Sequence, residues 1–402
     1  MSSDYTPSPE VLQKYAEVLV NFALNSGEGV QKGEVVELGV SDVAKQMIRP
    51  LQNEVLKSGG HPMIRILPTG NDKDFYELAN EEQLTFFPEK YLQAKVDLVD
   101  HRLVVYADPD PFELKDVDPA KIMKARDARK PYRDWLVAKE VAGNYTWTIG
   151  LWGVPAKAAE VGLSYEEYWE QIIKACFLDQ DDPVAEWRQI QRQQEDIKSK
   201  LNQLEIDHLV VEGEDVQLTV KLGANRIWQG GSGRNIPSFE FFTSPDWRGV
   251  EGWIRFNQPV YRYGQMMKDV YLKFEKGVVA EAHAKVGQQL LDQMLKSPNA
   301  DKAGEFSLTD KRMSRISHVM AETLYDENIG GPYGNTHLAL GLAYKDCYRG
   351  DKSKVSDKEW EEMGYNNSPE HTDIVSTTDR TVTAHLVNGD QKVIYKDGQF
   401  VL

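Results

Sequence analysis

Residues 34–67 read EVVELGVSDVAKQMIRPLQNEVLKSGGHPMIRIL, a pattern of strand, helix and strand. A short β-branched run at 34–40 leads into a helical stretch that begins at Ser41 as N-cap and stops at a pair of glycines. A second strand-like run follows at 63–67. Alternation of this kind favours a parallel sheet that is flanked by helices.

The alternation continues on both sides of this unit. Before it, Ser8 and Pro9 have the types expected at the N-cap and the first position of a helix. The further helical stretches are 9–22, 74–83, 119–140 and 164–177, and the further β-rich runs are 102–109 and 145–154. We therefore expect an α/β N-terminal domain over 1–181, with a mostly parallel sheet. Neither GxGxxG nor GxxxxGK[ST] follows any of these strands, so we interpret this domain as a scaffold or lid and not as a nucleotide site.

The second half of the chain has a different character. Residues 182–207 predict one amphipathic helix, and Gln194 interrupts its apolar stripe, which favours a connecting helix over a coiled coil. Residues 208–402 are rich in strand patterns, contain one clear helix at 285–297 and end in a hairpin pattern. We expect an α+β catalytic domain there, with a bent and largely antiparallel sheet.

Composition excludes several classes of protein. The chain has 402 residues with 41% hydrophobic residues, which is ordinary for a globular protein, and no apolar run approaches a membrane span. A formal charge of −16 disfavours nucleic acid as a partner. Arginines and aromatics alternate at 247–264, but we interpret that stretch as two amphipathic strands. Cys176 and Cys347 have no CxxC spacing, and the N-terminus lacks a secretory pattern, so we expect a cytoplasmic protein with neither a disulfide framework nor a thiolate zinc site.

The candidate chemistry lies in four short stretches of the second half. They carry Glu240, Glu305, then Glu327, His337 and Tyr344, and finally His371 and Asp373. Taken singly, each residue is better explained as a salt-bridge partner or as a hydrogen-bonded surface residue. Carboxylates among apolar neighbours need a strong partner such as a metal ion, however, and all these residues fall in loop or strand-end stretches of one domain. The set predicts a paired site for divalent ions, with imidazole and carboxylate ligands.

Such a site could activate a water molecule for hydrolysis. Two ions about 3.5–4 Å apart can share a bridging water and acidify it for attack on a carbonyl. Tyr344 follows His337 by seven residues, and its phenol could stabilise the developing oxyanion. The glycines Gly330, Gly331 and Gly334 would let the backbone turn sharply and deliver His337 to a metal.

The same four stretches resemble the thermophilic-type dinuclear metalloaminopeptidases, the family of aminopeptidase T and aminopeptidase S. The similar motifs are NIPSFEFFTSP with Glu240, GEFSL with Glu305, TLYDEN and HLALGLAY with His337 and Tyr344, and SPEHTD with His371 and Asp373. The chain departs from the family at Ser238 and Phe239, where an aspartate and a glycine are common. It also has a longer segment between DEN and the histidine.

The resemblance implies an exopeptidase that removes single residues from short peptides with a free N-terminus. It implies metal ligands at Glu240, Glu305, His337, His371 and Asp373, a catalytic Tyr344, and a homodimer. Glu327 would be a further ligand or the general base. We expect two divalent ions per chain, zinc or cobalt ahead of manganese or magnesium. The alternatives are another dinuclear metallohydrolase, such as a dipeptidase or amidase, and a non-catalytic peptide-binding protein.

Overall fold

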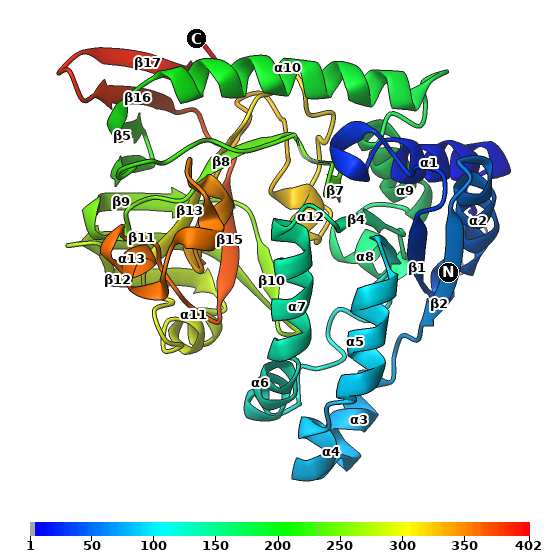
Figure 1. Ribbon diagram of the computed structural model, residues 1–402. Helices are drawn as coiled ribbons and strands as arrows, with labels where there is room; N and C mark the ends of the chain where they lie inside the picture. The colour runs from blue at the N-terminus through cyan, green and yellow to red at the C-terminus, as the bar shows by residue number, and fades with distance from the viewer. Residues whose placement is uncertain (1–4, 232) are drawn as a thin grey trace. The chain divides into compact units, whose positions relative to one another are not determined.

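The computed structural model describes residues 5–231 and 233–402, which form two compact units (Figure 1). The first unit takes in the described residues up to 189 together with 233–237, and the second takes in 190–231 and 238–402. Helix α10 (Pro183–Gln203) contributes to both units. Compactness does not show which segments fold independently, so the domain boundaries expected from the sequence stay predictions.

The first unit is built on a parallel sheet. Its strand order is β2-β1-β3-β4-β7, and every neighbouring pair is parallel. The strands are β1 (Val35–Ser41), β2 (His61–Leu67), β3 (His101–Tyr106), β4 (Thr146–Leu151) and β7 (Asn235–Ile236). The predicted parallel sheet is therefore confirmed.

Helices flank this sheet, as expected. They are α1 (Pro9–Asn21), α2 (Ile48–Lys57), α3 (Asp72–Leu78), α4 (Glu81–Thr85), α5 (Glu89–Leu98), α6 (Pro119–Ala128), α7 (Lys130–Val141), α8 (Pro155–Glu160) and α9 (Tyr165–Ala175), with short 3₁₀ turns η1 (Asn25–Gly27) and η2 (Asp42–Met47). Ser8 caps α1 by accepting a hydrogen bond from the Val11 N–H at 3.3 Å. Tyr15 and Leu19 of α1 pack over Gly150 of β4, where a larger residue would collide with the Tyr15 ring.

Three helix predictions need correction. Ser41 makes no side-chain cap; its hydroxyl accepts from the Ala107 N–H instead, and η2 precedes α2. The stretch 74–83 divides into α3 and α4, because Asn80 starts a new helix with its own capping box. The stretch 119–140 divides into α6 and α7 at Arg129, just before Pro131, whose ring cannot follow an unbroken helix.

The second unit contains two antiparallel sheets, where the sequence predicted one bent sheet. The larger sheet has nine strands in the order β10-β11-β9-β6-β5-β16-β17-β18, with β12 paired to β11. These strands are β5 (Ile206–Gly213), β6 (Val216–Lys221), β9 (Val250–Phe256), β10 (Val260–Arg262), β11 (Gln265–Glu275), β12 (Val278–Val286), β16 (Thr381–Leu386), β17 (Gln391–Lys396) and β18 (Gln399–Phe400). The predicted antiparallel character and the C-terminal hairpin are confirmed.

The smaller sheet has four strands in the order β15-β14-β13-β8. They are β8 (Glu240–Thr243), β13 (Ala303–Thr309), β14 (Asn335–Gly341) and β15 (His371–Ser376). Every residue of the two central strands, β13 and β14, is buried, so any charged side chain on them lies in the protein interior.

Short helices complete this unit. They are α11 (Gln288–Met294), α12 (Thr323–Asp326), α13 (Asp357–Glu362), and the 3₁₀ turns η3 (Trp247–Gly249), η4 (Lys345–Cys347) and η5 (Lys352–Lys354). The helix expected at 285–297 is shorter, because Lys285 and Val286 end β12 and Gly287, with φ +76°, separates the strand from α11. Among the described residues, no helix has both the length and the apolar character that crossing a bilayer requires.

Candidate metal centre

The five predicted metal ligands come from all four strands of the smaller sheet. Glu240 opens β8, Glu305 lies in β13, His337 lies in β14, and β15 carries both His371 and Asp373. The strand register places Glu240 opposite Thr309, His337 opposite Ser307, and Ala339 opposite both Glu305 and Asp373. Side chains alternate along a strand and opposite residues share a face, so all five side chains leave the sheet on the same face.

Their functional atoms converge on His337. The Nε2 atom of His337 lies 3.2 Å from Glu240 Oε2, 3.1 Å from Glu305 Oε1 and 3.9 Å from Asp373 Oδ1. The Nε2 atom of His371 lies 3.4 Å from Asp373 Oδ1 and 3.9 Å from Glu305 Oε2. Register between strands thus brings together side chains that are far apart in the sequence.

The cluster is buried and rich in carboxylates. The side chain of His337 is 0% exposed, that of Glu305 4%, and those of Glu240 and Asp373 11% each. Burial, together with the nearby carboxylates Glu240 and Asp373, raises the pKa of Glu305 to about 7 although its hydrogen bond to His337 acts in the opposite direction. The site therefore holds more negative charge than its own imidazoles can balance.

The two histidines respond to the same charges. Burial alone would lower the pKa of His337, but hydrogen bonds to Glu240 and Glu305 raise it well above its ordinary value. Burial opposes the shift at His371 as well, where Asp373 raises the pKa to about 9. Burial would raise the pKa of Asp373, but the charges of His371, His337 and Arg262 hold it below its usual range.

The donor set fits a divalent cation. Glu240, Glu305 and His337 each offer one ligand atom, and these atoms lie within 4.8 Å of one another. The Nδ1 atom of His371 lies 2.8 Å from the Leu342 carbonyl oxygen, which selects the tautomer that leaves Nε2 free to act as a ligand. Oxygen and imidazole donors without thiolate suit zinc, cobalt or manganese. Buried carboxylates in excess of cations are stable only with such compensation.

Glu327 and Tyr344 lie beside this cluster. Glu327 is buried at the end of α12, and burial together with the charges of Glu240 and Asp373 raises its pKa well above the ordinary value. Tyr344 follows β14, and its ring centroid lies 4.6 Å from that of His371. Burial and the charges of Glu305 and Asp373 raise its pKa well above the ordinary value, although 39% of the residue is exposed. Of these neighbours, Tyr344 is thus the one that solvent reaches most readily.

One detail of the local prediction changes, and one is supported. The candidates were expected in loop and strand-end stretches, but Glu305 and His337 lie inside β13 and β14. The glycines before His337 do permit a sharp turn: Gly331 and Gly334 have φ of +56° and +60°, and a Cβ at Gly334 would collide with the Thr309 carbonyl oxygen. The turn places the start of β14 in register with β13, which in turn positions His337.

Residues missed by the sequence analysis also contact the cluster. The hydroxyl of Ser307 lies 3.4 Å from Glu240 Oε2 and could have been noticed, since Ser307 follows Glu305 by two residues on a strand. Arg262 and Glu370 form an ion pair at 3.4 Å next to His371. Arg262 carried no sequence signal, because β10 meets β15 only through the tertiary fold.

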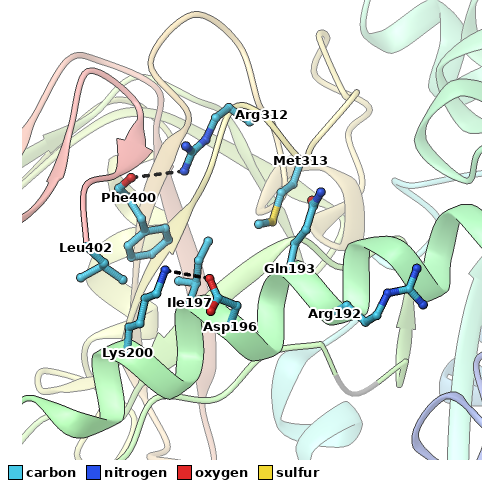
Figure 2. Close-up of a pocket in the computed structure, with 9 residues that line it drawn as sticks. All are labelled: Arg192, Gln193, Asp196, Ile197, Lys200, Arg312, Met313, Phe400 and Leu402. Atoms are coloured by element: carbon cyan, nitrogen blue, oxygen red, sulfur yellow. Dashed lines mark hydrogen bonds and ion pairs between the residues drawn. The ribbon is translucent and has the colours of Figure 1, made fainter.

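A separate hollow of about 500 Å³ lies between α10 and the C-terminal end of the chain (Figure 2). Two ion pairs lie in its lining: Lys200 with Asp196 at 2.8 Å, and Arg312 with Asp310 at 2.5 Å. Arg312 also donates to the Phe400 carbonyl oxygen at 3.2 Å (Figure 2). None of the predicted site residues lines this hollow, so the buried cluster and not the hollow is the candidate functional site.

Comparison with known proteins extends over both units. A model of the family described as thermophilic metalloprotease (M29) matches residues 9–400. Aminopeptidase T of Thermus aquaticus is 29% identical, with 98% of this chain and 99% of that protein covered. Aminopeptidase 2 of Geobacillus stearothermophilus is 28% identical, with 97% of each covered. The solved structure of wild-type AmpT from Thermus thermophilus has a TM-score of 0.83 at 25% identity, covering 98% of this chain and 99% of that one.

Proposed function

Because this chain belongs to the thermophilic metalloprotease (M29) family, we propose that it is a metal-dependent aminopeptidase that releases the N-terminal residue of short peptides. Membership makes it a peptide-bond hydrolase of the metalloprotease class. The aminopeptidase activity is supported by relatives that are named aminopeptidases. They match this chain over nearly their full length. The observation that carries the proposal is the buried cluster of Glu240, Glu305 and His337, three donors from three adjacent strands.

We assign two divalent ions to the site, with Glu240, Glu305, His337, His371 and Asp373 as ligands. Two ions are supported by the number of donors, since five carboxylate and imidazole side chains share one sheet face and the Nε2 atoms of both histidines lie near Asp373. Zinc or cobalt suits the imidazoles best, and manganese or magnesium would favour the carboxylates. Metal analysis of the purified protein by mass spectrometry measures both identity and number.

The proposed mechanism divides the work among named groups. Bound divalent ions supply Lewis acidity, which lowers the pKa of water and polarises a carbonyl. Glu327 accepts the proton of the attacking water, because burial and the neighbouring carboxylates raise its pKa and make it a stronger base than an ordinary glutamate. The hydroxyl of Tyr344 stays protonated, since its pKa is raised, and donates a hydrogen bond to the oxygen of the attacked carbonyl. The free amine of the substrate would be held by a carboxylate of the site or by one of the ions.

The first experiment compares a free and an N-acetylated copy of the same peptide. Protein stripped with a chelator is assayed for release of amino acids before and after single divalent metals are added back. Return of activity on the free peptide alone supports the aminopeptidase. Equal cleavage of both peptides favours a broader dinuclear hydrolase such as a dipeptidase or amidase. Binding without cleavage under every metal favours a peptide-binding protein.

We further propose a homodimer. The edge strand β2 supports it, because Met63, Ile64 and Ile66 are 41%, 46% and 47% exposed on a strand that has a partner on one side only. Exposed apolar edges are usually covered in native proteins, since they invite pairing with another strand. A second copy that pairs along β2 would cover them symmetrically.

A cytoplasmic location is proposed as well. Both cysteines, Cys176 and Cys347, are free and buried, as in proteins of reducing compartments. Cell fractionation tests this location directly.

A further inference from the structure

Arg262 lies at the end of β10, next to a tight turn into β11. It pairs with Gln265 across the two-residue loop Tyr263–Gly264, in which both residues have positive φ, +53° and +69°. Positive φ at both positions is typical of the type I′ turn that two-residue hairpin loops favour. The turn holds the Arg262 side chain at a defined place.

This turn is held against the metal-ligand strand. The N–H of Gln258 donates to the Val375 carbonyl oxygen at 3.2 Å, which ties the start of β10 to β15. At the other end, the Tyr263 hydroxyl donates to Glu370 Oε1 at 2.5 Å, and Arg262 Nη2 donates to Glu370 Oε2 at 3.4 Å. Glu370 immediately precedes His371. The guanidinium is therefore anchored to the residue before the first ligand of β15, and its charge acts on the second ligand, Asp373.

The guanidinium retains binding capacity. An arginine has five N–H donors in a planar fork, which matches a carboxylate. Its bond to Glu370 uses Nη2 at a long distance, whereas its Nε is buried and has no hydrogen-bond partner among the described residues. The side chain is 31% exposed, whereas that of Glu370 is only 5% exposed, so Arg262 is the member of this pair that a solute can reach.

The ligand side chains and Arg262 carry opposite charges. The ligand cluster is acidic, and Arg262 is a cation whose charge acts on Asp373 from outside the ligand set. A short unblocked peptide has a positive amine at one end and a carboxylate at the other. The proposed aminopeptidase reaction places the amine end at the metal site, and the carboxylate is attracted to Arg262.

We propose that Arg262 is a specificity-determining residue that binds the terminal carboxylate of short peptide substrates. The inference rests on the proposed aminopeptidase function and adds a preference for peptides short enough to reach from the cluster to this arginine. Glu370 and Tyr263 orient the guanidinium of Arg262 but leave some of its N–H donors unused. The carboxylate of a bound substrate would form charge-assisted hydrogen bonds with these donors.

The test compares a tripeptide with its C-terminal amide, and both with an octapeptide, in the metal-loaded enzyme. We expect Arg262→Met to raise KM for the free tripeptide about tenfold, as befits the loss of a charge-assisted bond, with kcat little changed. The amide and the octapeptide should keep their kinetics within about twofold. Arg262→Lys should restore part of the affinity, because it keeps the charge but not the fork.

Arg255→Met is the matched control. Arg255 lies on β9 of the same unit, and its guanidinium stacks over the Tyr271 ring at 5.1 Å, so its loss should leave all three substrates unaffected. Thermal unfolding and metal content of each variant exclude misfolding as the cause. An equal loss on amide and free peptide in Arg262→Met overturns the carboxylate assignment.

Failure of the proposed function gives a different result. If the wild-type enzyme releases no residue from any of the peptides, the aminopeptidase proposal fails, and calorimetric binding of the uncleaved tripeptide and its amide decides the role of Arg262. Equal affinities there overturn the inference, and a preference for the free carboxylate that Arg262→Met removes supports it.

Discussion

His337 has no exposed surface, and its Nε2 atom lies within 3.2 Å of two carboxylate oxygens. Such an atom is either a protonated donor to both carboxylates or the neighbour of a shared cation. In the absence of metal, the raised pKa of His337 favours the protonated donor. To act as a metal ligand, His337 must lose this proton. Metal and proton therefore compete for this position.

Replacing His337 tests its assignment as a ligand. We expect His337→Ala to lose bound metal and to lower kcat/KM by at least about 100-fold, because even outer-shell partners of a metal site are commonly worth 10–100-fold. Metal analysis and peptide kinetics provide the two readouts. His208→Ala, a change on β5 of the same unit, should retain both metal and activity. Full metal content in His337→Ala would remove this residue from the ligand set.

Tyr344 makes a separable prediction. Loss of one donor to an oxyanion typically costs about 10²–10³ in kcat, so Tyr344→Phe should lose activity on that scale with unchanged metal content. KM should change little, because the hydrogen bond strengthens only in the transition state. If Tyr344→Phe instead binds less metal but keeps its kcat per bound ion, Tyr344 stabilises the metal site and is not the oxyanion donor.

At the scale of elements, the site depends on the close approach of β13 and β14. Gly304 precedes Glu305, and a Cβ there would collide with the carbonyl oxygens of Gly341 and Leu342. We expect Gly304→Ala to separate these strands and to destabilise the protein by about 2 kcal/mol or more, with loss of metal. Urea unfolding and metal analysis measure the effects. Gly39→Ala on β1 is the control, since a Cβ there meets its neighbours at ordinary contact distances of 3.5 Å and longer.

The charged sheet face also predicts how metal-free protein responds to pH. Burial raises the pKa of Glu305 to about 7, and Asp373 raises that of His371 to about 9 although burial opposes it. Both exceed the values of about 4.3 and 6.5 expected in the unfolded chain, so the folded state binds these protons more tightly. Their stabilisation is complete below the unfolded values, and it is lost from about pH 4 to 7 for Glu305 and from about pH 6.5 to 9 for His371.

The free energy of unfolding of the stripped protein should therefore fall by roughly 4 kcal/mol between pH 6 and 9. Urea unfolding at several pH values with chelator present measures the slope. Added metal should flatten or reverse it, because the ions bind the deprotonated ligands. His371→Gln should reduce the slope of the stripped protein above pH 6.5. A slope that is the same in this variant and in the wild type would contradict the assignment.

At the scale of the whole molecule, the exposed edge strand β2 predicts assembly. Ile66→Lys should convert the proposed dimer into a monomer, since a charge on an edge strand opposes pairing. Light scattering after size-exclusion chromatography measures the mass. Val387→Lys, at an exposed apolar position of the second unit, is the control and should leave the mass unchanged. A wild-type protein that elutes as a monomer would refute the homodimer.

The element types of both halves followed from local patterns, and most element boundaries were near those observed. The errors occurred where a tertiary contact or a local cap replaced the expected partner, as at Ser41, whose hydroxyl bonds Ala107 and does not cap a helix. Gln194 is an example in the other direction. It looked like a defect in an apolar stripe, but it is buried and donates to the Ser238 carbonyl oxygen at 3.2 Å.

The sequence by itself determined the chemistry of the candidate site and the type of each sheet, because residue types and hydrophobic periodicity are local properties. Only the tertiary structure decided that Glu240, Glu305, His337 and Asp373 share one face, because strand register is set by pairing between segments far apart in the chain. It also decided that Arg262 pairs with Glu370, the residue before His371. That contact joins two sheets, and no spacing along the chain encodes it.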